Sequence, residues 1–233
     1  MKYLVTLSLA LLTLNYSPSL FAQESSSGGY TALFNGKDLT NWRGLVGNGN
    51  PYTLAEMSAE ERATAQAAAD EEMKAHWSVQ DGVLVFDGKG KSLCSAKDYK
   101  DFELWVDWKI EAAGDSGIYL RSTPQVQIWD TEYPDYFKHG AEKGSGSLWN
   151  NKDHERFPLV KADNPVGEWN TFHITMKGEN VTIYLNGKLV TDNVVLENFW
   201  KKDGSPVIEQ GAIELQNHGN TLYFKNIFVK ELN

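Results

Sequence analysis

The sequence contains almost no cysteine: Cys94 is its only one. A single thiol cannot form a disulfide within its own chain. The fold must therefore be held together by its apolar core, even in an oxidising compartment where disulfides are common. Eight tryptophans, ten tyrosines and ten phenylalanines can build that core and still leave aromatic rings for a binding surface.

Runs of basic residues are also missing. The chain has 22 Lys and Arg against 31 Asp and Glu, which gives a net charge of −9. Proteins that bind nucleic acids or anionic membranes usually present a basic surface. The composition therefore argues against both kinds of partner, and it fits an uncharged ligand such as a sugar.

A long apolar run occurs only near the start, at residues 3–14. This run is shorter than the ~20 residues that a bilayer span needs. Lys2 precedes it and the small residue Ala22 follows it, which is the pattern of a secretory signal peptide over residues 1–22. We therefore expect a periplasmic or secreted protein without a membrane anchor in the mature chain, and a flexible leader over residues 23–29.

Most of the mature chain consists of short stretches that alternate apolar and polar residues. Asp81–Gly82 and Asn186–Gly187 each lie between two such stretches, as the turn of a tight β-hairpin does. Many short strands and few helices predict an all-β fold, an antiparallel β-sandwich of the jelly-roll type. No repeat or linker divides residues 30–233, so a single domain is expected there.

Two segments depart from the alternating pattern. Residues 58–75 are rich in Ala and Glu, which are strong helix formers, and Ser58 with Glu61 can form a capping box. This predicts a helical insertion on the surface, and the Gly- and Asn-rich loop before it either borders a site or is a surface addition. Residues 131–164 are predicted to form a long ordered loop over one face, because they carry several aromatic residues.

The alternation also predicts which side chains face away from the core. Val126 and Ile128 are expected to face inward, which turns their neighbours outward. If the strands share one sheet, its outer face collects these residues: Asp107, Tyr119, Arg121, Gln127, Trp129, Glu214, Gln216 and His218. Aromatic rings and planar polar groups suit a sugar. A solvated sheet face without function is the structural alternative.

Five stretches resemble the 3-keto-disaccharide hydrolase family: LFNGKDLTNWRG, GDSGIYLRS, VQIWD, GEWNTFHITMKGENVTIYLNGKLV and GAIELQNHGNTLYFKNIFVKEL. The resemblance implies a concanavalin A-like sandwich and the cleavage of a glycoside whose sugar carries a ketone at C3. The positions that match the family's motifs are Ser116, Gly117, Arg121, Gln127 and Asp130. Gln125 is a departure, because many relatives have a Glu there, and Trp129 is bulkier than the usual aliphatic residue.

A ketone at C3 acidifies the hydrogen on C2, so that a base can remove it and the enolate can expel the oxygen on C1. Such a reaction needs a base, a donor for the enolate oxygen and help for the leaving group. The predicted catalytic residues are Asp107, Arg121, Asp130 and His139. We expect Arg121 or a metal ion to stabilise the enolate, and one of the other three residues to act as the base.

The predicted substrate-binding residues are Tyr119, Gln127, Trp129, Trp149, Glu214, Gln216 and His218. Glu214 or His218 is expected to assist the leaving group. For His139 and His218, the alternative is an exposed histidine without a role.

The sequence requires no cofactor, although residues 163–170 offer oxygen ligands for Ca²⁺ or another divalent metal. The Glu-x-Asp-x-x-Glu pattern of laminarinases is not met by QVQIWDTE. This disfavours ordinary hydrolysis between two facing carboxylates. The alternative function is a non-catalytic, lectin-like carbohydrate-binding module, because a fold does not decide a function.

Overall fold

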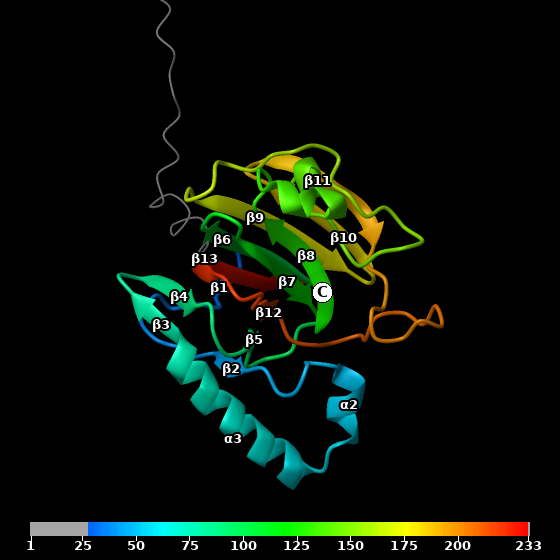
Figure 1. Ribbon diagram of the computed structural model, residues 1–233. Coiled ribbons are helices and arrows are strands. Elements are labelled where there is room, and N and C mark those ends of the chain that lie inside the picture. Colours follow the sequence, from blue (N-terminus) through cyan, green and yellow to red (C-terminus); the bar gives the residue numbers. More distant parts are fainter. Residues whose placement is uncertain (1–27, 233) are drawn as a thin grey trace, which may run out of the picture.

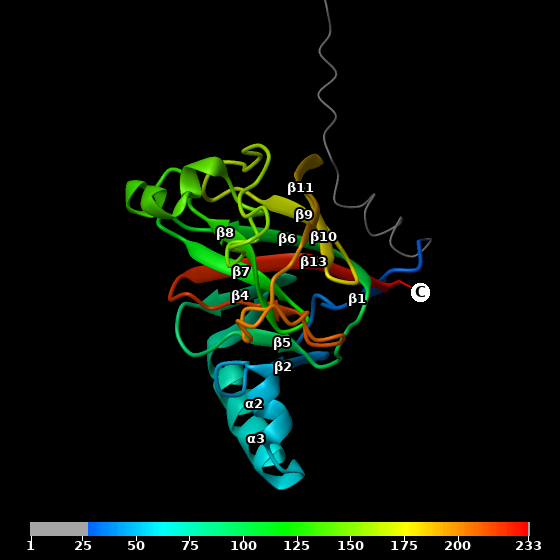
Figure 2. The same ribbon diagram turned by 90° about the vertical axis from the view of Figure 1, so that its right-hand side faces the viewer.

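The computed structural model describes residues 28–232, and the predicted signal peptide lies outside them. Within these residues the chain forms two antiparallel β-sheets in two layers, with the two α-helices to one side (Figures 1 and 2). The predicted all-β sandwich is confirmed. Between residues 28 and 232, no helix is both long enough and apolar enough to cross a membrane.

The larger sheet, sheet A, has its strands in the order β11-β10-β9-β6-β13-β4-β3, and β1 also pairs with β13. Its strands are β1 (Thr31–Ala32), β3 (Trp77–Gln80), β4 (Val83–Asp87), β6 (Phe102–Ile110), β9 (Asn170–Lys177), β10 (Asn180–Leu185), β11 (Lys188–Val195) and β13 (Thr221–Glu231).

The smaller sheet, sheet B, has the order β2-β5-β12-β7-β8. Its strands are β2 (Trp42–Gly44), β5 (Leu93–Ser95), β7 (Asp115–Leu120), β8 (Thr123–Trp129) and β12 (Glu214–Leu215). The strands β7, β8 and β12 are therefore neighbours in one sheet, whereas β6 belongs to the other.

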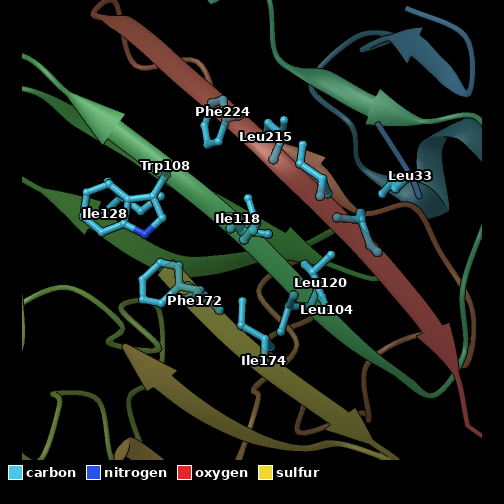
Figure 3. Packing of buried hydrophobic residues seen from close by; sticks show 14 of the residues in the cluster. Leu33, Leu104, Trp108, Ile118, Leu120, Ile128, Phe172, Ile174, Leu215 and Phe224 are labelled. Carbon is cyan, nitrogen blue, oxygen red and sulfur yellow. The ribbon is translucent and has the colours of Figure 1, made fainter. Parts of the chain in front are cut away.

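Apolar side chains from both sheets fill the space between them (Figure 3). In β6, Phe102, Leu104, Val106 and Trp108 are buried, and the residues that alternate with them are half-buried. Ile118 of β7 and Ile128 of β8 meet them from sheet B. Each such side chain contributes about 1.5–3 kcal/mol by its burial. Because a slip by one residue would turn all of them outward, the core fixes which residues of each strand face away from it.

Two predicted hairpin turns are present. Asp81 and Gly82 join β3 to β4, and Asn186 and Gly187 join β10 to β11. All four residues have positive φ, between 51° and 78°. This conformation gives a two-residue turn the twist of the flanking strands, and it favours Asn, Asp and Gly.

The insertion before β3 contains two helices, α2 (Pro51–Glu56) and α3 (Ala59–His76). The capping box is present at the start of α3, where the backbone N–H of Glu61 donates to the hydroxyl of Ser58 and the Glu61 carboxylate accepts from the Ser58 backbone. Most of α3 is exposed, and it projects from the sandwich in Figure 1.

Helix α3 is attached to the sandwich at β2. Asp70 Oδ1 accepts a hydrogen bond of 2.9 Å from the backbone N–H of Gly44. A Cβ on Gly44 would lie only 2.0 Å from the carbonyl oxygen of Ala69. Glycine is therefore required at this contact, because a side chain would push the helix away from the sheet.

The loop over residues 131–164 is ordered by two short helices, η1 (Pro134–His139) and η2 (Ala141–Lys143), and by contact with β8. The backbone N–H of Gln127 donates to Ser147, and the N–H of Gly146 donates to Gln127. The loop thus pairs with the edge of sheet B and covers part of its outer face. This explains why every residue of β8 is buried although the strand lies at an edge.

Candidate functional site

A cleft of about 380 Å³ opens on the outer face of sheet B. Its floor comes from β7, β8 and the segment after β12, and its walls come from the loop 131–164 and from Phe199. The predicted site residues that line it are Tyr119, Gln127, Trp129, His139, Trp149, Gln216 and His218. The structure therefore brings together all of the predicted substrate-binding residues except Glu214, together with one predicted catalytic residue.

Asp115 supplies the carboxylate of this cleft. Its Oδ1 accepts a hydrogen bond of 2.7 Å from Nε2 of Gln127, and its Oδ2 lies 3.4 Å from Nδ1 of His218. Burial raises the pKa of Asp115, and the nearby His218, Gln127 and His139 act in the opposite direction. The carboxylate is therefore a better proton acceptor than an exposed aspartate, and it has a histidine beside it.

Gln127 holds Asp115 in place. Its Nε2 also lies within hydrogen-bond distance of the carbonyl oxygens of Ser116 (3.0 Å) and Ile128 (3.1 Å), and its Oε1 accepts from Nε2 of Gln125. The amide of Gln127 is thus engaged within the protein. We conclude that Gln127 orients the carboxylate of Asp115, in addition to lining the floor.

Tyr119 and Gln216 form a second polar pair on the floor. Nε2 of Gln216 donates to the hydroxyl oxygen of Tyr119 at 3.2 Å, so the phenol hydrogen can be donated to a ligand. Burial, followed by the nearby Glu214, raises the pKa of Tyr119 well above its ordinary value, so the hydroxyl stays protonated. A Cβ on Gly117 would lie 3.0 Å from Oε1 of Gln216, so the glycine leaves room for this amide.

Aromatic rings form one wall. The ring of Trp149 stands edge-on to that of Trp129, with centroids 6.4 Å apart, and to His139 at 6.0 Å. Trp129 is fixed by its Nε1, which donates to the carbonyl of Gly144 at 3.1 Å. The guanidinium of Arg156 lies 4.3 Å from the centre of the Trp149 ring. Rings held in this way offer a rigid apolar surface to one side of a sugar.

The expected grouping of Asp107 with the other site residues is wrong. Asp107 lies on β6, and β6 pairs with β9 and β13 in sheet A. It faces the outer side of that sheet, where its carboxylate accepts hydrogen bonds from Thr171 (2.6 Å) and Asn226 (2.7 Å). The two sheets and the core separate Asp107 from the cleft.

The expected position of Arg121 is also wrong. Arg121 and Ser122 have positive φ and form the tight turn between β7 and β8, so the alternation of β7 ends before them. The Arg121 side chain is buried, and it donates to the carbonyl oxygens of Gly178 and Glu209. Its guanidinium therefore fastens two loops and does not line the cleft.

Asp130 does not line the cleft either. It follows β8, and its carboxylate accepts from the backbone N–H groups of Ala113 (2.8 Å) and Glu132 (2.9 Å). It therefore stabilises a turn.

Glu214 lies on the expected face of sheet B, directly opposite Tyr119 in the strand pairing, but it is only 3% exposed. The loop before α2 covers it, because a Cβ on Gly49 would lie 3.4 Å from Oε2 of Glu214. Burial raises the pKa of Glu214 to about 8. The insertion thus seals this end of the face.

The sequence analysis missed Asp115 as a site residue. The signal was present: if Tyr119 faces outward in a strand, then residues 117 and 115 do so too. Gln125, Asn150 and Phe199 also line the cleft and were not among the predicted site residues. Asn150 and Phe199 lie in loops, where a two-residue period gives no information.

The predicted oxygen ligands in residues 163–170 already have partners within the protein. Asp163 accepts hydrogen bonds from the backbone N–H of Ser145, and Oδ1 of Asn170 accepts from Asn164 and Asn186. Among residues 28–232, no three His, Cys, Asp or Glu side chains are grouped so that they could hold a metal ion.

The chain is similar in sequence and fold to known proteins. A 3-keto-disaccharide hydrolase of Bacteroides thetaiotaomicron is 24% identical over an alignment of 284 positions, which covers 95% of this chain and 87% of the relative. A crystal structure of a candidate glycosyl hydrolase from Parabacteroides distasonis is 26% identical, with a TM-score of 0.65, and the match covers 91% of this chain and 97% of that one. A second such structure from the same organism, at 23% identity and a TM-score of 0.60, shares the fold over 88% of this chain and 84% of its own.

The family described as the 3-keto-alpha-glucoside-1,2-lyase-like domain matches residues 29–230. This match extends over nearly all of the described residues and includes every strand of both sheets except the last residue of β13. The family resemblance seen in the sequence is thereby confirmed, and the chain belongs to the family of 3-keto-alpha-glucoside-1,2-lyase-like domains.

Proposed function

We propose that this protein is an enzyme that cleaves glycosides whose sugar carries a ketone at C3. The observation that carries the proposal is the pairing of Asp115 with His218 inside an aromatic cleft of sugar size. The family membership and the hydrolase relative support the same substrate class. The proposed reaction is an elimination, followed by the addition of water.

Asp115 is the proposed base, in place of the candidates expected from the sequence. A base of this reaction must accept a proton from C2, and its pKa should lie near the working pH. The raised pKa of Asp115 meets this requirement better than that of an exposed aspartate would. Gln127 keeps one carboxylate oxygen oriented, while the other faces His218.

Tyr119 is the proposed donor to the enolate oxygen, a role expected for Arg121 from the sequence. The enolate carries negative charge on the oxygen at C3, and a donor that is already in place stabilises it without reorganisation. The phenol is protonated and oriented by Gln216. Arg121 is engaged with two carbonyl groups elsewhere in the structure.

The steps of the proposed reaction balance without an added oxidant or reductant. Asp115 takes the proton from C2, and the electron pair moves to the C3 oxygen, which accepts a hydrogen bond from Tyr119. The pair then returns to form the C1–C2 double bond while the C1–O bond breaks. His218 or His139 gives a proton to the leaving oxygen, and water then adds its hydroxyl to C1 and its proton to C2. Proton exchange with solvent returns Asp115 and the histidine to their starting states.

A 3-keto-glucoside with a chromogenic leaving group tests this proposal. We expect the wild-type protein to release the chromophore from the 3-keto-glucoside and not from the parent glucoside, because only the ketone acidifies C2. Tyr119→Phe removes the enolate donor and should lower kcat by about 10²-fold or more. Tyr184→Phe is a matched control, because Tyr184 is an exposed residue of β10 in sheet A.

Equal release from both glucosides would contradict the role of the ketone. Binding of sugars without release from either compound would favour the lectin-like alternative, which the aromatic wall can serve equally well. A periplasmic or secreted location and any requirement for a divalent metal stay predictions. They are checked by cell fractionation and by assays with and without a chelator.

A further inference from the structure

A row of four residues crosses the outer face of sheet B from the insertion to the cleft. Arg43 of β2 is paired with Cys94 of β5. Glu214 of β12 is paired with Cys94 on one side and with Tyr119 of β7 on the other. Residues directly opposite one another in antiparallel strands have their Cβ atoms about 4.5–5.5 Å apart. Glu214 is therefore the direct neighbour of Tyr119, the proposed donor to the enolate oxygen.

The insertion closes one end of this row. A small cavity of about 30 Å³ lies beneath it, and its lining includes Arg43, Leu45, Leu54, Cys94 and Glu214. A Cβ on Gly49 would lie 2.8 Å from Cδ1 of Leu45 and 3.4 Å from Oε2 of Glu214, so the glycine brings the loop close to the carboxyl group. Glu214 is thus shielded from solvent, whereas Tyr119 lines the open cleft.

Two arginines also line the cavity, but one is already paired and the other is exposed. The guanidinium of Arg43 forms an ion pair with Asp98 at 2.9 Å. Arg62 reaches the cavity from α3, and its side chain is exposed to solvent. Solvent and an existing partner both weaken the attraction of an arginine for a further carboxylate. A negative charge on Glu214 would therefore be only weakly compensated.

The remaining neighbours of Glu214 are neutral groups. The Sγ atom of Cys94 lies 4.0 Å from Oε2 of Glu214. Burial, followed by the nearby Glu214, raises the pKa of Cys94, so that it stays a thiol. Burial also raises the pKa of Glu214 to about 8, and the hydroxyl of Ser92 acts in the opposite direction. Most of the Glu214 carboxyl groups are therefore neutral at pH 7.

A charge on Glu214 would affect the reaction through Tyr119. The proposed enolate carries its negative charge on the oxygen to which Tyr119 donates, and two negative charges repel each other strongly where water is excluded. Glu214 is already the second cause, after burial, of the raised pKa of Tyr119. A neutral carboxyl group at this position leaves the enolate without such repulsion.

We propose that Glu214 controls the reaction through Tyr119: the neutral acid permits the enolate to form, and the carboxylate opposes it, which sets an upper pH limit on catalysis. The inference rests on the proposed function, because it assumes that Tyr119 faces the enolate oxygen. The insertion is part of this device, since it keeps water from the carboxyl group. Glu214 lies outside the cleft, so it is a positioning residue and not a catalytic one.

The test measures kcat of the full-length mature protein between pH 6 and 9 with the chromogenic 3-keto-glucoside, and enzyme-free samples correct for spontaneous elimination. The wild-type kcat should fall by about tenfold between pH 7 and 9, because most Glu214 carboxyl groups lose their proton over this interval. Glu214→Gln stays uncharged at every pH. Its fall between the same two pH values should be smaller by about fivefold or more.

Two further variants complete the test. Leu45→Ala opens the cavity to water, which favours the carboxylate, so the midpoint of the fall should move to lower pH. This variant decides the question if Glu214→Gln does not fold. Asp107→Asn is the matched control, because burial raises the pKa of Asp107 too, but on sheet A. It should keep the wild-type pH profile.

The inference is overturned, with the proposed function intact, if the wild type releases the chromophore and Glu214→Gln loses activity as steeply as the wild type does. An unchanged midpoint in Leu45→Ala, a wild-type kcat that does not fall, or an equally flat profile in Asp107→Asn would overturn it as well. A wild type that releases no chromophore at any pH overturns the proposed function, and the inference with it.

Discussion

The outer faces of the two sheets carry similar groups but differ in what surrounds them. On sheet A, Nε2 of His173 lies 3.6 Å from Glu103, and the ring of His173 stacks on Trp105 at 4.1 Å. On sheet B, Nδ1 of His218 lies 3.4 Å from Asp115, near a wall of aromatic rings. A carboxylate, an imidazole and an aromatic ring are therefore present on both faces.

The two faces differ in how far loops surround these groups. The groups on sheet A pack against one another: Tyr30 donates to Glu103, and His173 lies between the rings of Trp105 and Tyr184. The cleft on sheet B includes none of these residues. On sheet B, the loop 131–164 and the segment around Phe199 rise on either side of the carboxylate. A carboxylate–imidazole pair therefore becomes a candidate site when long loops surround it and leave room for a ligand.

The largest expected effect comes from exchanging one carboxylate on each face. Asp115→Asn should lower kcat/KM for a 3-keto-glucoside by about 10²–10⁴-fold, the usual contribution of a general base. Glu103→Gln on sheet A should leave kcat/KM unchanged. Steady-state kinetics on both variants provides the measurement. A similar loss in both, or in neither, would remove the distinction between the faces.

The comparison becomes sharper at Glu214, which shares a face with Asp115 but lies sealed under the insertion. Its pKa is raised from 4.5 to about 8 in the folded state, so the folded protein binds this proton more tightly than the unfolded chain does. Its contribution therefore lowers stability as pH rises from about 4.5 to about 8, and levels off above that. The full pKa shift of Glu214 corresponds to a loss of unfolding free energy on the order of a few kcal/mol.

Glu214→Gln removes this titration. Denaturant unfolding between pH 5 and 9 should show a stability that falls less steeply in the variant than in the wild type. Parallel stability curves would mean that Glu214 is not the buried acid described here. Asp107→Asn is the matching variant on sheet A, and it measures how that carboxylate contributes to the free energy of unfolding over the same pH range.

A smaller effect is expected from the aromatic wall. Trp149→Ala should raise KM for a 3-keto-glucoside by about threefold to tenfold, because a ring contact contributes about 0.5–1.5 kcal/mol beyond its area. Trp105→Ala on sheet A should leave KM unchanged. If the two substitutions changed KM equally, the wall would have no specific part in binding.

The smallest effect is expected where the insertion supports the cleft. Nδ2 of Asn198, the residue before Phe199 in the cleft wall, donates a hydrogen bond of 2.8 Å to the hydroxyl of Tyr52 in α2. Tyr52→Phe removes this acceptor and should lower the free energy of unfolding by about 1 kcal/mol, a typical net value for one hydrogen bond. In a domain of this size, the melting temperature should then fall by about 2–4 °C. Tyr184→Phe serves as the exposed control. An unchanged melting temperature in Tyr52→Phe would show that the insertion does not stabilise this wall.

Much of the fold could be predicted from the sequence, because alternation and turn chemistry are local. The inward direction of Val126 and Ile128 and the two hairpins at Asp81–Gly82 and Asn186–Gly187 follow from neighbouring residues alone. The same period correctly turned Gln216 toward the cleft.

The site was less predictable, because alternation does not say which sheet a strand joins or what covers it. Asp107 has the expected direction, but strand order places it in sheet A. Glu214 has the expected direction and sheet, but an insertion distant in sequence buries it. Arg121 lies in a turn without the Gly or Asn that usually marks one. Asp115 shares the outward direction of Tyr119 through the two-residue period of β7, although it was not among the predicted site residues.

Deuterium at C2 of the product provides the most direct test of the central claim, that Asp115 removes the C2 proton in the cleft of sheet B. A 3-keto-disaccharide is cleaved in D₂O, and the released keto-sugar is analysed by NMR, with an enzyme-free sample to correct for spontaneous exchange. We predict one deuterium at C2 with the wild type and with Asp107→Asn, and almost no product with Asp115→Asn. Hydrogen retained at C2, or wild-type incorporation by Asp115→Asn, would contradict the account.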